Sequence, residues 1–197
     1  ELWVKLIGSF NAYNLLAIYG AADLLGLETL NTLQLMSELE SVEGRCQYLI
    51  SKKNITAIVD YAHTPDALKN VLETINTIRT KNEELITVVG CGGDRDITKR
   101  PKMGAIAATL STKVIFTSDN PRSENPLAII DSIEKGVPGE YFSKTISISD
   151  RKQAIKTACQ LANEGDIILI AGKGHETYQE IKGERFDFDD FKIINEL

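Results

Sequence analysis

Five short apolar runs rich in β-branched residues recur along the chain, separated by longer stretches of helical character. The runs lie at residues 55–60, 85–90, 113–117, 145–148 and 166–171. Strands buried on both faces have this pattern, and they are typical of parallel sheets. The predicted helices lie between the runs, at residues 65–79, 102–110, 126–135 and 151–163. This alternation predicts an α/β fold, with a mostly parallel sheet covered by helices on both faces.

The beginning of the chain departs from this alternation. Residues 10–25 carry apolar side chains at helical spacing, with Gly26 as a C-cap, and a shorter helix is predicted at 29–39. A polar, glycine-containing stretch then indicates a domain boundary. We therefore expect three parts, namely residues 1–40 as the end of a preceding domain, 41–45 as a linker and 46–197 as the α/β domain.

Turn and cap residues mark other element boundaries. Thr64 and Pro65 supply the N-cap and the first residue of the helix after the first apolar run. Residues 180–188 alternate around Lys182-Gly183-Glu184, a pattern that predicts a hairpin, and a helix is expected after it. The hairpin therefore interrupts the βα repeat after the last apolar run.

Polar clusters follow four of the predicted strands. They are Asp60-Tyr61-Ala62-His63-Thr64-Pro65-Asp66, Gly90-Cys91-Gly92-Gly93-Asp94-Arg95-Asp96, Asp119-Asn120-Pro121-Arg122 and Gly172-Lys173-Gly174-His175-Glu176. Ligands of open α/β sheets bind outside the carboxyl ends of the strands, so these clusters are expected to meet at one rim. Two arginines and several carboxylates at one rim suit a small zwitterion that carries both carboxylate and ammonium groups.

The arginines are the most informative of these residues. Pro121 stiffens the loop that aims Arg122, and an arginine fork matches a carboxylate through two hydrogen bonds. The alternative for this loop is an Asx-type turn that leads into the next helix. Arg95 lies between two aspartates in a glycine-rich turn, where the alternative is a solvated loop charge. Neither loop has the spacing of a Walker A or dinucleotide-binding motif.

The remaining cluster residues have both functional and structural interpretations. Glu176 offers a carboxylate to an ammonium group, and the glycines around Lys173 are compatible with a phosphate-binding loop. His175 is more often structural than catalytic. Asp60 and His63 suit a metal or a ribose, whereas Asp66 is favoured as a support for a helix N-terminus.

Composition narrows the class of protein. The chain is 43% hydrophobic and 25% charged, as soluble globular proteins are, and its net charge of −6 argues against a general nucleic-acid binder. No apolar run approaches the ~20 residues of a membrane-spanning helix, and no signal peptide is visible, so no membrane partner is expected. The chain opens within an apolar segment without Met, and we expect it to be part of a longer protein.

The cysteines do not define a site. Cys46, Cys91 and Cys159 form no CxxC motif, so they predict neither a disulfide framework nor a zinc site. They fit a reducing compartment, and a cytoplasmic location is expected. Cys91 stands beside the glycine-rich turn, and a small buried thiol at a strand end is favoured there over a nucleophile.

Two alternatives of different classes remain open from the residues alone. The first is a metal-dependent phosphoesterase, since carboxylates and histidines at one rim can bind two metals. Its candidate ligands are Asp60, His63, Asp94, Asp96, Asp119 and His175. It leaves Arg95 and Arg122 unexplained. The second is a non-catalytic module that binds an amino acid.

Taken together, these motifs resemble those of the Mur ligases, and within them the members that add meso-diaminopimelate. The resemblance runs nearly end to end through Phe10–Ala17, Gly44-Arg45, Asp60–Leu68, Gly90–Asp96, Lys99–Pro101, Met103–Ala107, Asp119–Arg122 and Ala171–Glu176. It implies an ATP-dependent amide ligase of peptidoglycan (cell wall) synthesis. In that reaction the carboxylate of UDP-MurNAc-L-Ala-D-Glu is phosphorylated, and the amine of the amino acid attacks the acyl phosphate. A Rossmann-like C-terminal domain is implied, preceded by the helical tail of an ATPase domain.

The resemblance also implies roles for individual residues. The implied amino-acid ligands are Arg95, Asp119, Asn120, Pro121, Arg122, Gly172 and Glu176. Arg122 and Asn120 would hold the distal carboxylate, Gly172 and Glu176 the distal ammonium, and Arg95 the carboxylate beside the reacting amine. The residues implied to lie near ATP are Asn11, Asn14, Arg45 and Asp60.

Some features of the family are missing or altered. There is no GxxxxGK[ST] loop, no evident magnesium ligand set and no UDP-sugar domain. ATP and Mg²⁺ are therefore expected to be bound mainly upstream, with no catalytic residue and no metal ligand here, and this chain alone is expected to be inactive. Cys46-Gln47 replaces an apolar residue followed by Glu, and the usual glycine before Lys99-Arg100-Pro101 is replaced, giving Ile97-Thr98-Lys99.

Overall fold

The computed structural model describes residues 2–6, 8–80 and 82–196, and the chain divides into two units, Glu1–Val42 and Glu43–Leu197. Each unit is described by itself. In this described part of the chain, no helix is long and apolar enough to cross a membrane.

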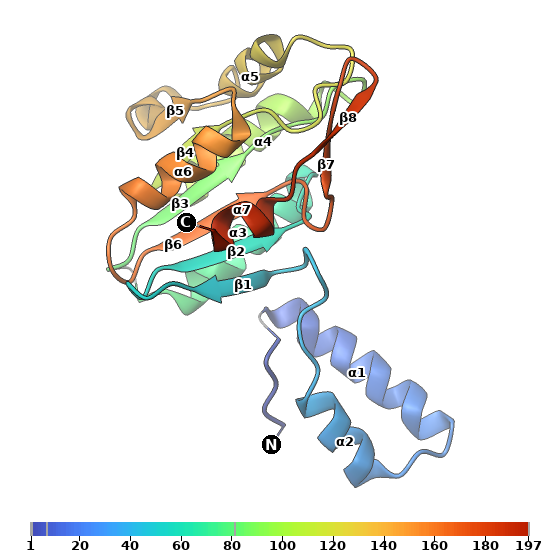
Figure 1. Cartoon of the computed structure of the whole chain (residues 1–197). Coiled ribbons are helices and arrows are strands. Elements are labelled where there is room, and N and C mark those ends of the chain that lie inside the picture. Colours follow the sequence, from blue (N-terminus) through green and yellow to red (C-terminus); the bar gives the residue numbers. More distant parts are fainter. Residues whose placement is uncertain (1, 7, 81, 197) are drawn as a thin grey trace. The chain divides into compact units, whose positions relative to one another are not determined.

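The first unit is a pair of helices, α1 (Ser9–Leu24) and α2 (Thr29–Ser37) (Figure 1). Gly26 follows α1 with a φ of 72°, the left-handed conformation in which glycine commonly ends a helix. Large apolar side chains of α1 are exposed, among them Leu16 at 67% and Leu24 at 89%. Both helices lie where the apolar spacing predicts them.

The second unit is built on a six-stranded sheet in the order β1-β2-β6-β3-β4-β5. Its strands are β1 (Gln47–Ile50), β2 (Thr56–Asp60), β3 (Leu85–Val89), β4 (Lys113–Phe116), β5 (Thr145–Ser147) and β6 (Ile167–Ala171). Every pairing is parallel except that of β1 with β2. The α/β prediction, with a mostly parallel sheet, is therefore confirmed.

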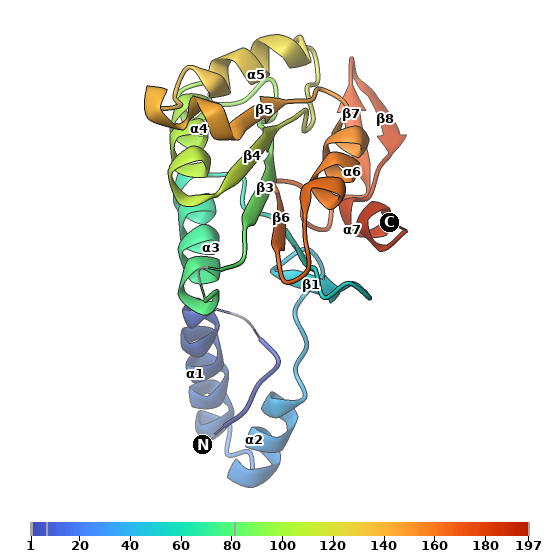
Figure 2. The ribbon, with the colours of Figure 1, turned by 90° about the vertical axis from the view of Figure 1, so that its left-hand side faces the viewer.

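Helices cover both faces of this sheet (Figure 2). They are α3 (Pro65–Ile78), α4 (Lys99–Leu110), α5 (Pro126–Glu134), α6 (Arg151–Leu161) and α7 (Asp190–Asn195). Alternate strand residues serve the two faces, so that Leu85 and Val89 of β3 pack in the cluster with α3, α4 and α5. Ile86 and Val88 pack in the other cluster, with α6 and α7.

Three local features differ from the sequence pattern or lie outside it. The strand β1 is not predicted, because its side chains alternate between half-buried and exposed instead of forming an apolar run. A 3₁₀ helix, Gly139–Lys144, is also not predicted. The helix α4 begins at Lys99 rather than at residue 102, because Pro101 lies in its first turn, where a missing N–H costs no helical hydrogen bond.

The expected hairpin is present as β7 (Tyr178–Ile181) and β8 (Glu184–Asp187), and it pairs with the rest of the domain through Arg122. The N–H of Arg122 donates to the carbonyl of Glu180 at 3.0 Å, and the N–H of Lys182 donates to the carbonyl of Arg122 at 2.7 Å. The hairpin therefore fixes the backbone of the loop after β4.

A fully buried ion pair joins the starts of α6 and α7. Arg151 Nε and Nη2 donate to the two carboxylate oxygens of Asp190 at 2.9 and 2.7 Å. Arg151 Nη2 also donates to the carbonyl of Ala171, the last residue of β6, at 3.1 Å. Both side chains of the pair are 0% exposed. The pair thus ties two helices to the carboxyl end of the central strand.

Asp190→Asn should strongly destabilise the protein, because it keeps the side chain's shape but leaves the Arg151 charge buried and uncompensated. Removing one partner of a buried pair costs about 3–5 kcal/mol. Urea unfolding followed by circular dichroism measures this loss. The control is Glu73→Gln, which breaks an exposed pair with Lys69 and should cost at most about 0.5 kcal/mol. Equal stabilities of the two variants would contradict the prediction.

Burial also controls the reactivity of the cysteines. It raises the pKa of the Cys46 and Cys91 thiols to about 12, whereas Cys159 is only half-buried and its pKa is raised less. The interpretation of Cys91 as a small buried thiol is confirmed.

Cys159 should therefore be the first cysteine to react with a disulfide reagent at pH 8. A pKa near 12 leaves the other two thiols about a thousandfold less ionised than an ordinary cysteine. Mass spectrometry of the labelled protein identifies the modified residue, and Cys159→Ser should abolish fast labelling until the protein is unfolded. Rapid labelling of native Cys91 would show that this burial is wrong.

Candidate functional site

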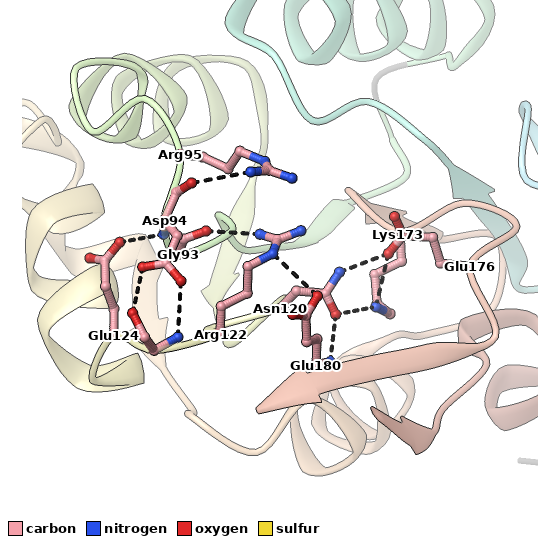
Figure 3. A network of polar contacts seen from close by, with 10 residues as sticks. Gly93, Asp94, Arg95, Asn120, Arg122, Glu124, Lys173, Glu176 and Glu180 are labelled. Carbon is pink, nitrogen blue, oxygen red and sulfur yellow. Dashed lines mark hydrogen bonds and ion pairs between the residues drawn. The ribbon is translucent and has the colours of Figure 1, made fainter. Parts of the chain in front are cut away.

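A cleft of about 540 Å³ opens at the carboxyl ends of β2, β6, β3 and β4. Because β6 lies between β2 and β3, the loops that follow these strands are neighbours, as expected at the switch point of an open sheet. Its lining includes six of the seven residues that the resemblance implies as amino-acid ligands, all but Pro121, and these six are Arg95, Asp119, Asn120, Arg122, Gly172 and Glu176. The polar groups of this wall form one connected network (Figure 3).

Arg122 is held on one side and open on the other. Its backbone has a φ of 51°, and its Nη1 donates to the carbonyl of Gly93 at 2.8 Å. Its Nε lies 3.3 Å from a carboxylate oxygen of Glu180. A side chain at Gly92 would place a Cβ 2.9 Å from Nη1, so a glycine there leaves room for the guanidinium. Nη2 has no polar partner among the described residues, and it is available to a carboxylate in the cleft.

Asn120 is a buried bridge between the two ends of the network. Its Nδ2 donates to Glu176 Oε2 at 2.8 Å, and its Oδ1 accepts from Lys173 Nζ at 3.1 Å and from the N–H of Glu180 at 2.9 Å. These bonds fix the orientation of the amide. Because Asn120 makes three hydrogen bonds among the described residues and keeps only one hydrogen of Nδ2 unused, its main effect is to order its neighbours.

Glu176 presents a single oxygen to the cleft. Its Oε2 accepts from Asn120 and from Lys173 Nζ, the latter at 3.2 Å, whereas Oε1 has no polar partner within the described residues. Asp119 lies against Gly172, where a Cβ would come within 2.6 Å of the Asp119 carboxylate. With its φ of 120°, Gly172 is a position that favours glycine.

Arg95 extends from a loop that is tightly fixed. Its Nη1 donates to the carbonyl of Asp94 at 3.2 Å, and the rest of the guanidinium is free of protein partners in the described structure. The Asp94 carboxylate accepts from the N–H and hydroxyl of Ser123, and these bonds hold the pKa of Asp94 below its usual value. Asp96 accepts in the same way from Thr98, which closes the turn where the family's usual glycine is replaced.

The metal-dependent alternative receives no support from this geometry. The carboxylate of Asp94 accepts from Ser123 in the loop after β4, and the carboxylate of Asp96 accepts from Thr98 in its own turn. Within the residues that the structure describes, no group of three or more His, Cys, Asp or Glu side chains is placed to hold a metal ion.

The start of the second unit is anchored to the end of β2. Asp60 accepts from the N–H of Ala62 at 2.9 Å and from the N–H of Cys46 at 2.7 Å. Gln47 closes the same turn by accepting from the N–H of Gly44 at 3.0 Å. Asp60 therefore fixes the backbone at the start of the second unit against the end of β2.

Arg45 and three aromatic rings lie together beside this anchor. The exposed Arg45 guanidinium lies 4.9 Å from the centroid of the Tyr61 ring, and Tyr61 contacts the rings of His63 and His175. Asn11 and Asn14, the other residues implied to lie near ATP, belong to α1 of the first unit. There Asn14 Nδ2 donates to Asn11 Oδ1 at 3.1 Å.

The sequence pattern indicates no role for two residues of the network, Lys173 and Glu180. Lys173 lies in a glycine-flanked loop, and no signal in the sequence distinguishes a buried lysine there from a phosphate-binding one. Glu180 lies in the predicted hairpin, and only the pairing of that hairpin with Arg122 reveals its position.

Known proteins match this chain in both sequence and structure. The family model described as "Mur ligase, glutamate ligase domain" matches residues 44–174. The UDP-N-acetylmuramoyl-L-alanyl-D-glutamate–2,6-diaminopimelate ligase of Cytophaga hutchinsonii is 58% identical over 100% of this chain and 40% of its own length. The protein of the same name from Bacteroides thetaiotaomicron is 54% identical over 100% of this chain and 41% of its own length.

Solved structures agree with these matches. One is the structure of a UDP-N-acetylmuramoyl-L-alanyl-D-glutamate–2,6-diaminopimelate ligase, which is 40% identical to this chain with a TM-score of 0.76. The match covers 99% of this chain and 39% of the ligase chain. The UDP-N-acetylmuramate-alanine ligase of Thermotoga maritima, 20% identical with a TM-score of 0.69, covers 98% of this chain and 38% of its own, and shares the fold. This chain spans about 40% of the length of its curated relatives, and it belongs to the Mur ligase family.

Proposed function

We propose that this chain is the C-terminal part of an ATP-dependent ligase that adds meso-diaminopimelate to UDP-MurNAc-L-Ala-D-Glu during peptidoglycan synthesis. The names of the similar proteins support this activity. In this reaction ATP phosphorylates the carboxylate of the dipeptide, and the amine of the amino acid displaces phosphate to form the amide bond. The substrates are nucleotide-linked or small and polar, which suits a cytoplasmic enzyme.

The observation that carries the proposal is that one cationic and one anionic side chain, each with an atom that is unbonded within the described part of the chain, lie on the same wall of the cleft. Arg122 offers Nη2 to a carboxylate, and Glu176 offers Oε1 to an ammonium group. The distal end of meso-diaminopimelate carries both of these groups on one carbon, which distinguishes it from lysine. Asn120 lies between the two in Figure 3 and orders both sides.

The other amino-acid ligands complete this assignment. Arg95 reaches from its loop with an open guanidinium and suits the carboxylate beside the reacting amine. Gly172 and Asp119 shape the wall at the end of β6, and Pro121 stiffens the loop that carries Arg122. These residues bind and orient the amino acid, so the amine meets the activated carboxylate in a reactive geometry.

ATP is proposed to contact Arg45 and Asp60 of the second unit. For Asn11 and Asn14 of the first unit, a contact with ATP rests on the resemblance to the family alone. The exposed guanidinium of Arg45 suits a phosphate or a ribose oxygen, and stacking on Tyr61 limits its freedom. Mg²⁺ would neutralise charge on the phosphates of ATP, and we propose that it is bound mainly by residues outside this chain.

Arg122→Ala in the full-length ligase should remove most activity with meso-diaminopimelate. Each charge-assisted hydrogen bond that the guanidinium makes to the distal carboxylate contributes about 1.5–3 kcal/mol, so kcat/KM should fall at least tenfold. Arg122→Lys should restore little, because a point charge cannot replace the fork. Lysine need not become a substrate, since neither change creates a new pocket.

The control is Arg79→Ala, which removes an arginine at the end of α3 that lies outside the cleft and whose guanidinium donates to the carbonyl of Glu83. It should leave kcat/KM for meso-diaminopimelate unchanged. A change of less than about threefold in Arg122→Ala, below about 1 kcal/mol, would reject the assignment of the distal carboxylate to Arg122.

Arg45→Ala and Asp60→Asn should both raise the KM for ATP more than the KM for the amino acid. Arg45→Ala removes a ligand, whereas Asp60→Asn weakens the anchor at Cys46 that holds Arg45 in place. Initial rates with each substrate varied in turn measure the two constants in the full-length enzyme. If the KM for the amino acid rose more than the KM for ATP, the assignment of Arg45 and Asp60 to the ATP site would be wrong.

A further inference from the structure

Lys173 is a fully buried cation directly behind the cleft. Its side chain is 0% exposed, and it is absent from the lining of the cleft, although both of its polar partners line it. Its Nζ lies 3.1 Å from Asn120 Oδ1 and 3.2 Å from Glu176 Oε2, and 5.5 Å from the centroid of the Tyr178 ring. Figure 3 shows the contacts of the ammonium group with Asn120 and Glu176 as dashed lines.

A buried lysine is expensive unless its charge is paired and its donors are satisfied. The ammonium group has only donors, so any atom that faces it must be an acceptor. Lys173 therefore requires Asn120 to turn Oδ1 inward, which sends Nδ2 to Glu176. It also holds Oε2 of Glu176 inward, and this leaves Oε1 for the cleft.

The same contacts argue against a phosphate-binding role for Lys173. A lysine that binds phosphate must bring its ammonium group to the ligand. Here Nζ lies behind Asn120 and Glu176, and reaching the cleft would break both bonds and leave Glu176 without its cationic partner.

We propose that Lys173 is a positioning residue that sets which atoms of Asn120 and Glu176 face the cleft, and so selects amino acids with a distal ammonium group. This inference rests on the proposed function. Lys173 does not touch the amino acid, and it acts through the carboxylate of Glu176.

The test uses the full-length ligase with two acceptors, meso-diaminopimelate and 2-aminopimelate. The second keeps both carboxylates but lacks the distal amine. Lys173→Met fills a similar volume without charge, and Glu176 is partly exposed, so the variant is expected to fold. It should lower the preference for meso-diaminopimelate over 2-aminopimelate by about tenfold, which is the loss of one charge-assisted hydrogen bond. The KM values for ATP and for the UDP-linked dipeptide should stay within about twofold.

A double-mutant cycle tests whether Lys173 acts through Glu176. Glu176→Gln alone should remove most of the preference, and adding Lys173→Met should then change it by less than about twofold. Lys113→Met is the matched control, because Lys113 pairs with Glu84 at the other end of the sheet. It should leave the preference unchanged.

The possible outcomes separate the inference from the proposed function. No turnover of meso-diaminopimelate by the unmodified enzyme would overturn both. Three outcomes would overturn the inference alone. The first is normal turnover by a folded Lys173→Met variant with an unchanged preference for meso-diaminopimelate. The others are effects of Lys173→Met and Glu176→Gln on the preference that simply multiply in the double variant, and an equal rise in the KM values of all substrates in Lys173→Met. If Lys173→Met does not fold, Lys173→Gln, which keeps hydrogen-bond donors but not the charge, takes its place under the same criteria.

Discussion

The insertion of β6 between β2 and β3 is the constraint on which the site depends. The strand pairs in parallel with both neighbours, Ile168 and Ile170 pack on one face, and Leu169 packs on the other. Its burial fixes where β6 ends, and the loop from Gly172 must then emerge between the loops after the adjacent strands. Residues more than a hundred positions apart in the sequence meet at one edge because of this one pairing.

Buried charges hold that edge in place. Arg151 bonds to Asp190 and to the carbonyl of Ala171, immediately before Gly172, and Lys173 bonds to Asn120 and Glu176 immediately after it. Groups of this kind are tolerated in an interior only when their partners are present, so each restricts the conformations open to the loop. Asn120 and Glu176 in the wall of the cleft therefore share a partner, Lys173, that lies deeper in the protein.

The fold and the rim of the site can be predicted from the sequence because they depend on local patterns. Apolar runs fix the parallel strands, and the loops that follow them bring together Arg95, Arg122 and Glu176. The inward position of Lys173 and the contact of Glu180 with Arg122 cannot be predicted in this way. The Glu180 contact arises when β7 pairs with the loop after β4, and the position of Lys173 depends on its contacts with Asn120 and Glu176. Neither tertiary contact has a local signature in the sequence.

Two oppositely charged residues of the cleft each have a partner within the protein, and this explains why they do not pair with each other in the cleft. Arg122 and Glu176 have opposite signs, yet each already has a partner, Glu180 for the first and Lys173 for the second. Asn120 is bonded to Glu176, Lys173 and Glu180. Arg122 and Glu176 therefore need not form an ion pair with each other, and within the described structure Nη2 of the first and Oε1 of the second stay open. A zwitterionic end then adds one negative and one positive charge, which leaves the local balance unchanged. In the proposed function, an amino acid with only a distal ammonium group would add uncompensated positive charge beside Arg122, so lysine would be disfavoured by repulsion as well as by the missing contact.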